Sequence, residues 1–178
     1  MFKFIYLAVP LFTVGVSFWT SGASALPSPY VVKPGKLSAP LKEGAVVGGQ
    51  ADREFSLLNV VSKTIAKGER ITLTYGDVVG KPVSGEPGFF HAVLDRGSKR
   101  IVIDLAQVGK TRVDAETLRK TFASSRFVSS TDITMDPHDG STNITLNLKS
   151  PVTFLAGTDV RKGSQIVFEL REVSGSSK

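Results

Sequence analysis

The sequence predicts an all-β domain, a small sandwich of two sheets built from short antiparallel strands. Two observations lead to this prediction. From residue 55 onward, short runs of apolar residues alternate with polar ones, which is the period of a strand with one buried face. Glycine, proline and aspartate divide these runs about every 8–12 residues, a spacing typical of sandwiches.

The predicted strands cover most of the domain. In chain order they are Ser56–Lys63, Arg70–Tyr75, Phe89–Leu94, Arg100–Leu105, Val128–Met135, Asn143–Leu148, Pro151–Leu155 and Gln165–Val173. In the fourth strand we expect Ile101, Ile103 and Leu105 to share the buried face. The sequence Asp95-Arg96-Gly97-Ser98 predicts a hairpin turn before that strand, with a glycine able to take positive φ.

Asp114–Ser124 is the one segment whose pattern favours a short helix. Asp114 is a suitable N-cap, and Glu116 falls in the first turn, where a negative charge is favourable. Leu118 and Phe122 are four residues apart, which places them on one face. We therefore expect one short helix inside an otherwise β domain.

Residues 1–25 have the features of a secretory signal peptide. Lys3 precedes an apolar run from Phe4 to Phe18, and the segment ends in Ala23-Ser24-Ala25. A charged head, an apolar middle and a small-x-small end are what the export machinery and its peptidase recognise, so we expect cleavage after Ala25 and a periplasmic product. A retained anchor is the weaker interpretation, because Pro10 and Gly15 interrupt a run that is short for a membrane span.

The rest of the chain divides into a linker, one domain and a tail. Residues 26–54 contain four prolines and four glycines and show no apolar period, so we expect a semi-extended tether. Residues 55–173 form the β domain, and residues 174–178 are expected to be a disordered tail. The chain has no cysteine, which excludes both disulfides and acylation of an N-terminal cysteine.

The formal net charge of +6 comes from basic residues scattered along the chain. No dense run of like charges suggests a nucleic-acid arm or a polybasic membrane patch. Outside the cytoplasm, a mild basic excess suits anionic envelope polymers or an acidic partner. On charge alone, the simpler interpretation is that the excess keeps the protein soluble.

No arrangement of residues predicts catalysis, a metal or a cofactor. The two histidines, His91 and His138, lack the partners at motif spacing that zinc requires. The acidic turn around His138 lacks the spaced ligands of a calcium loop. No nucleophile motif or phosphate-binding glycine loop is present. We therefore expect a binding protein rather than an enzyme.

The segment Ser56–Val173 resembles the AMIN domain, a non-catalytic β module of bacterial envelope proteins. The central hairpin carries the resemblance, with Phe90-His91-Ala92-Val93-Leu94 leading into Arg100-Ile101-Val102-Ile103-Asp104-Leu105. Leu58-Asn59-Val60-Val61 and the strands Arg70–Tyr75, Ile144–Leu148 and Ile166–Leu170 support it. The chain departs from the family's usual plan because no amidase or secretin domain is attached.

The resemblance implies a sandwich that localises proteins in the envelope, as in N-acetylmuramoyl-L-alanine amidases and in secretins of type IV pili. It leads us to expect a module that docks on peptidoglycan or on an envelope assembly, with no nucleic-acid partner and no membrane anchor after cleavage. The alternative is an accessory protein of a type IV pilus or secretion complex that contacts a secretin.

The candidate binding residues are Arg96, Lys99, Arg100 and Asp104. Arg100 and Asp104 are expected to point outward if the apolar residues of their strand point inward, and Arg96 and Lys99 extend the basic edge. Guanidinium groups grip carboxylates in bidentate fashion, which suits the peptide stems of peptidoglycan. The alternative, which the sequence supports equally, is that Arg100 and Asp104 only keep the protein soluble or stabilise its fold.

Overall fold

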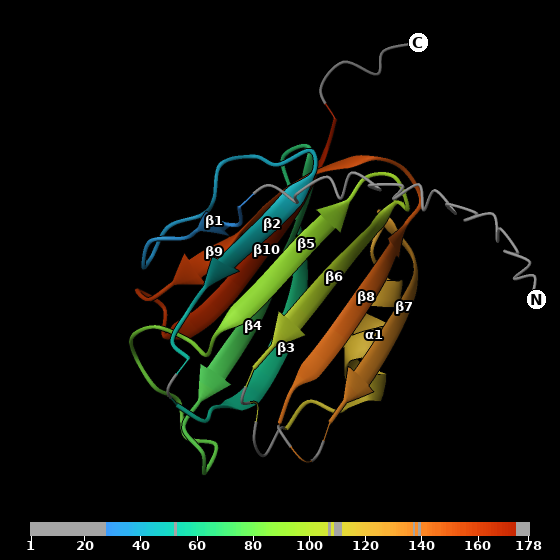
Figure 1. Cartoon of the computed structure of the whole chain (residues 1–178). Helices are drawn as coiled ribbons and strands as arrows, with labels where there is room; N and C mark the ends of the chain where they lie inside the picture. The colour runs from blue at the N-terminus through green and yellow to red at the C-terminus, as the bar shows by residue number, and fades with distance from the viewer. Residues whose placement is uncertain are drawn as a thin grey trace, which may run out of the picture.

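A computed structural model describes residues 28–51, 53–106, 108, 112–136, 138 and 140–173. In this part of the chain, ten strands and one helix form two stacked sheets (Figure 1). Sheet A has six strands in the order β1-β2-β5-β6-β8-β7, and sheet B has four in the order β3-β4-β10-β9. The predicted all-β sandwich is confirmed, with β1 and β2 paired in parallel and the other neighbours antiparallel.

The elements have the following bounds: β1 Tyr30–Val31, β2 Gly44–Gly48, β3 Ser56–Ile65, β4 Gly68–Gly76, β5 Phe90–Asp95, β6 Arg100–Leu105, α1 Ala115–Ala123, β7 Val128–Met135, β8 Thr142–Leu148, β9 Val152–Asp159 and β10 Ser164–Glu172. Each predicted strand is present, most with ends within two residues of the prediction. The exception is β9, which continues four residues beyond the predicted end at Leu155.

The core lies between the two sheets and follows the predicted alternation. Ile101, Ile103 and Leu105 are fully buried on the inner face of β6. Aromatic rings join the sheets, because Phe90 of sheet A meets Phe168 of sheet B edge to face, with 5.8 Å between ring centroids. Phe154 stacks on the other side of Phe168 at 5.9 Å. Burial of large side chains on both inner faces is the main source of stability in such a domain.

The helix α1 forms where the sequence predicts it. The Asp114 side chain accepts a hydrogen bond from the Thr117 backbone N–H at 2.7 Å, which satisfies one of the unpaired donors at the helix start. Leu118 and Phe122 are buried, and the helix packs against β7 and β3 at one side of the sandwich. Leu118 and Phe122 thus cover the apolar space between the two sheets at that side.

The expectation that residues 26–54 form a tether is wrong for the described part of that segment. Residues 44–48 are strand β2, which pairs with residues 90–94 of β5, and Val46 is fully buried. Residues 35–41, which we call the strap, run along the outer edge of β9. Local sequence gave no sign of this, because most backbone hydrogen bonds of the strap go to residues more than 100 positions away.

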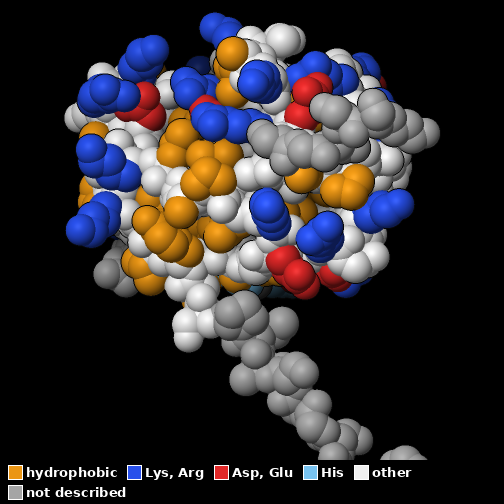
Figure 2. Space-filling model, turned by 90° about the horizontal axis from the view of Figure 1, so that it is seen from above, with side chains coloured by type: hydrophobic (Ala, Val, Ile, Leu, Met, Phe, Trp, Pro, Cys, Tyr) orange, Lys and Arg blue, Asp and Glu red, His pale blue; other side chains and the backbone are white. Residues whose placement is uncertain are grey.

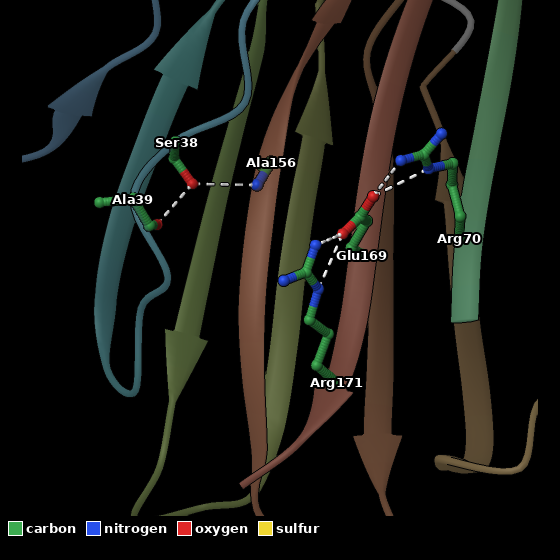
Figure 3. A network of polar contacts seen from close by, with 6 residues as sticks. All are labelled: Ser38, Ala39, Arg70, Ala156, Glu169 and Arg171. Carbon is green, nitrogen blue, oxygen red and sulfur yellow. Dashed lines mark hydrogen bonds and ion pairs between the residues drawn. The ribbon is translucent and has the colours of Figure 1, made fainter. Parts of the chain in front are cut away.

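The strap closes the edge of sheet B with a regular set of hydrogen bonds. The Ser38 and Leu41 N–H groups donate to the Ala156 and Phe154 carbonyls at 2.8 and 2.9 Å. The Ser38 hydroxyl accepts from the Ala156 N–H at 3.1 Å, an arrangement visible in Figure 3. An exposed strand edge invites pairing with other chains, so the strap also protects β9 from aggregation.

Gly157 lies in the part of β9 that extends beyond the predicted end, and it allows the strap to approach closely. A Cβ atom at this position would lie 2.0 Å from the Lys36 carbonyl oxygen and 2.7 Å from the Leu37 Cα. Glycine in a strand often marks a site where another backbone approaches closely, and here that backbone is the strap. The strand was predicted to end at Leu155, two residues before this glycine, whereas in the fold it continues through Gly157, where the strap docks.

The predicted signal peptide, residues 1–25, and the predicted tail, residues 174–178, lie outside the described residues. Among the residues that are described, no helix is both long and apolar enough to cross a membrane.

Candidate functional site

The hairpin between β5 and β6 brings three of the four candidate residues together. Arg96 and Lys99 lie in the turn, and Arg100 is the first residue of β6, paired with Asp95 across the hairpin. All three basic residues are exposed. The Arg100 Nε lies 3.5 Å from the Asp95 carboxylate, which orients the guanidinium along the sheet.

The turn itself is held by Asp95 and differs in one respect from the prediction. The Asp95 carboxylate accepts the Ser98 backbone N–H at 3.0 Å and the Ser98 hydroxyl. These hydrogen bonds, with a smaller contribution from the Arg100 charge, lower the pKa of Asp95. The left-handed residue of the turn is Lys99, with φ of 50°, and not Gly97. Lys99 is therefore presented from a defined backbone conformation that lysine rarely adopts.

Other basic residues gather at the same end of the sandwich, although they are far away in sequence. The Leu148 N–H donates to the Lys99 carbonyl at 2.8 Å, which places Lys149 beside the hairpin. The Lys149 ammonium in turn donates to the Ser125 carbonyl at 3.0 Å. We call this surface the basic end and define it by six exposed residues: Lys67, Arg96, Lys99, Arg100, Arg126 and Lys149.

Sheet B contributes to the basic end through two contacts of Glu172. Its carboxylate lies 3.4 Å from the Arg126 guanidinium, and its N–H donates to the Lys67 carbonyl at 3.1 Å. Figure 2 looks down on this end and shows Lys and Arg side chains spread over it, with fewer acidic side chains between them. The surface therefore carries a positive potential that spans both sheets.

Asp104 does not belong to the basic end. It lies four residues along β6 from Arg100, a separation of about 14 Å at the usual rise of a strand. Its carboxylate lies 3.3 Å from the His91 Nδ1 and accepts a hydrogen bond from the Asn143 side chain. These three residues are direct cross-strand neighbours on the outer face of sheet A. Asp104 thus holds a polar row on the sheet and does not assist Arg100.

Sequence reasoning missed Lys67, Arg126 and Lys149. The only local sign of the last was its place directly after the strand Asn143–Leu148. To use that sign, one must know that β8 pairs with β6 and that its end meets the β5–β6 turn. That pairing joins residues about 45 positions apart and is a property of the fold.

The described residues contain no group of three His, Asp or Glu side chains placed to hold a metal ion. A cavity of 690 Å³ lies among the loops at the opposite end of the sandwich. Its lining combines the acidic residues Glu54, Asp77 and Glu86 with Arg53, two loop valines and one proline. Three carboxylates against one guanidinium give this cavity a negative surplus, opposite in sign to the basic end.

In comparisons with known proteins, no protein-family model matches the chain and no curated protein matches its sequence. The functional proposal therefore depends on the residues and their geometry.

Proposed function

We propose that this protein is a non-catalytic binding module of the bacterial cell envelope that docks on peptidoglycan. The observation that carries the proposal is the basic end, where exposed cationic side chains of both sheets gather on short hydrogen-bonded turns. The signal-like start of the sequence and the resemblance of the β5–β6 hairpin to the AMIN domain support an envelope location for this surface.

The chemistry of the basic end suits the carboxylates of peptide stems. Arg96 and Arg100 offer planar donors that match a carboxylate in bidentate fashion, and Lys99 and Lys149 add point charges beside them. Each exposed contact is weak, but a polymer with repeated carboxylates engages several at once, so that the individual affinities reinforce each other. Such adhesion needs neither a nucleophile nor a metal.

The test is co-sedimentation of the purified protein with peptidoglycan sacculi. The protein is expected in the pellet at low and moderate salt, with less bound as the salt concentration rises. Arg100→Glu is expected to weaken binding about tenfold, because it replaces an attraction by a repulsion. Lys81→Glu makes the same charge change in a loop at the opposite end and is expected to leave binding unchanged.

Two outcomes contradict the proposal. One is protein that stays in the supernatant at every salt concentration, which would favour the accessory role in a type IV pilus or secretion complex with a secretin as partner. The other is equal weakening by the Arg100 and Lys81 variants. Circular dichroism of Arg100→Glu shows whether it is folded. If it is not, Arg96→Glu, in the exposed turn, replaces it.

A further inference from the structure

A groove on the outer face of sheet B has properties that the basic end does not explain. It is a cavity of 270 Å³ over the middle of β3, β4 and β10. Its lining is Asn59, Val61, Lys63, Arg70, Thr72, Thr74, Asp159, Lys162, Gln165 and Val167. A smaller hollow beside it is lined by the strap residues 35–37 and by Arg161, and the two share Arg70, Asp159 and Val167. The strap thus forms one wall of a continuous depression.

Arg70 is held in this groove by a buried carboxylate. Glu169 is fully buried, and its side chain lies between Arg70 and Arg171, as Figure 3 shows. Arg70 donates through Nε at 2.8 Å and through Nη2, which leaves Nη1 for another anion. The guanidinium is half exposed, so it is both fixed and accessible. A fixed donor binds a ligand with less loss of conformational entropy than a free side chain.

The acidic groups of the groove are neutralised by arginines. Burial alone would raise the pKa of Asp159, but hydrogen bonds and the charge of Arg161 lower it, and the Arg161 Nε lies 3.3 Å from the carboxylate. Glu169 is shared by two arginines. Lys63 and Lys162 are exposed at separate places on the rim. The groove therefore has a positive surplus distributed along its length.

The floor and walls fit an extended peptide. Val61, Thr72 and Val167 are cross-strand neighbours and form a flat floor of β-branched side chains. Asn59 and Gln165 carry side-chain amides, which pair well with the N–H and C=O groups of a peptide backbone. The described lining holds no aromatic ring, the group on which a sugar ring would be expected to stack.

We propose that this groove binds an acidic, extended segment of a partner protein, with Arg70 receiving a carboxylate and Lys63 and Lys162 contacting further acidic side chains. The site is separate from the basic end and does not depend on peptidoglycan binding. The groove gives the module a second binding surface. Through it, the module holds a partner protein at the site to which the basic end binds.

The test is fluorescence anisotropy with labelled octapeptides and the folded protein at about 0.15 M ionic strength, where long-range attraction is screened. Octa-glutamate is expected to bind and octa-glutamine is not. Lys63→Glu and Lys162→Glu are each expected to weaken octa-glutamate binding about tenfold or more. The matched control is Lys120→Glu, on the exposed face of α1, which is expected to leave binding unchanged.

Several results would overturn the proposal. Absence of octa-glutamate binding would do so, as would equal weakening by the Lys120 variant, which would indicate attraction to the net charge alone. Tighter binding of an octagalacturonate of equal charge would assign the groove to an acidic glycan. Amide chemical shifts give a check that needs no variant. On titration with octa-glutamate, the shifts of Thr72, Thr74 and Val167 should change, and those of α1 should not.

Discussion

The ion-pair network around Glu169 gives the sharpest quantitative prediction about this fold. Glu169→Gln keeps the size of the side chain and removes its charge. The carboxylate accepts four N–H groups, two from Arg70 and two from Arg171. A glutamine offers one acceptor oxygen and turns an NH₂ group toward guanidinium donors, so at least two of the four hydrogen bonds are lost.

The expected loss of stability follows from the exposure of the three side chains. Hydrogen bonds to charged groups contribute about 1.5–3 kcal/mol each, and breaking a buried ion pair costs about 3–5 kcal/mol. The two arginine side chains are 47% and 41% exposed, so water replaces part of what they lose. We therefore expect the lower bound, about 3 kcal/mol, which corresponds to a melting temperature lower by about 6–12 °C for a domain of this size.

The effect should depend on pH in a defined direction. Burial by itself would raise the pKa of Glu169, but hydrogen bonds from Arg70 and Arg171 outweigh it and hold the pKa below its ordinary value of 4.5. Because the folded state has the lower pKa, the stabilisation is complete above pH 4.5 and is lost as the pH falls through the folded pKa. The difference between wild type and variant should therefore shrink in acid.

The assay is urea unfolding followed by circular dichroism at neutral and acidic pH. Glu116→Gln is the control, since Glu116 forms an i,i+4 pair with Lys120 in which both side chains are at least 70% exposed. That pair is expected to contribute about 0.3–0.5 kcal/mol. The reasoning is refuted if Glu169→Gln costs less than about 1 kcal/mol, the size of an ordinary substitution, or if its cost is the same at both pH values.

Two further predictions concern the strap and the helix. Gly157→Ala should detach the strap, because the new Cβ would clash with the Lys36 carbonyl. We expect a loss of about 1–3 kcal/mol in the free energy of unfolding and faster proteolysis before residue 44. Gly97→Ala, in an exposed turn, should cause neither. If proteolysis of Gly157→Ala matches wild type, the strap is not docked as described. Asp114→Ala removes the N-cap carboxylate that accepts the Thr117 N–H, and it should lower the stability by about 1 kcal/mol, measured by thermal unfolding. An unchanged melting temperature would mean that packing alone fixes the start of α1.

Much of the fold was predictable because its signals are local. The alternation in Arg100–Leu105 requires a strand with Ile101, Ile103 and Leu105 buried, and the structure has all three inside. The cap and the spacing of Leu118 and Phe122 likewise predicted α1. The strap was not predictable, because a proline-rich segment without an apolar period has the same local appearance whether it is a tether or an edge partner of β9.

The candidate site was predictable only in part, for the same reason. Arg96, Lys99 and Arg100 are neighbours in sequence and remain neighbours in space. Asp104 was grouped with them because it lies on the same strand, yet its neighbours are His91 and Asn143 on the adjacent strands. The groove on sheet B was not predicted at all, since its lining comes from four strands and a turn.

The sequence by itself determined the class of fold, the positions of most strands and of the helix, and the inner face of β6, because the alternation of apolar and polar residues is imposed by the period of a strand. Only the tertiary structure decided which charges meet. Strand order and register bring Lys149 to Lys99, place Glu169 between two arginines, and lay the strap on Gly157. These contacts join residues distant in the chain, and their energies depend on burial and geometry that no local pattern contains.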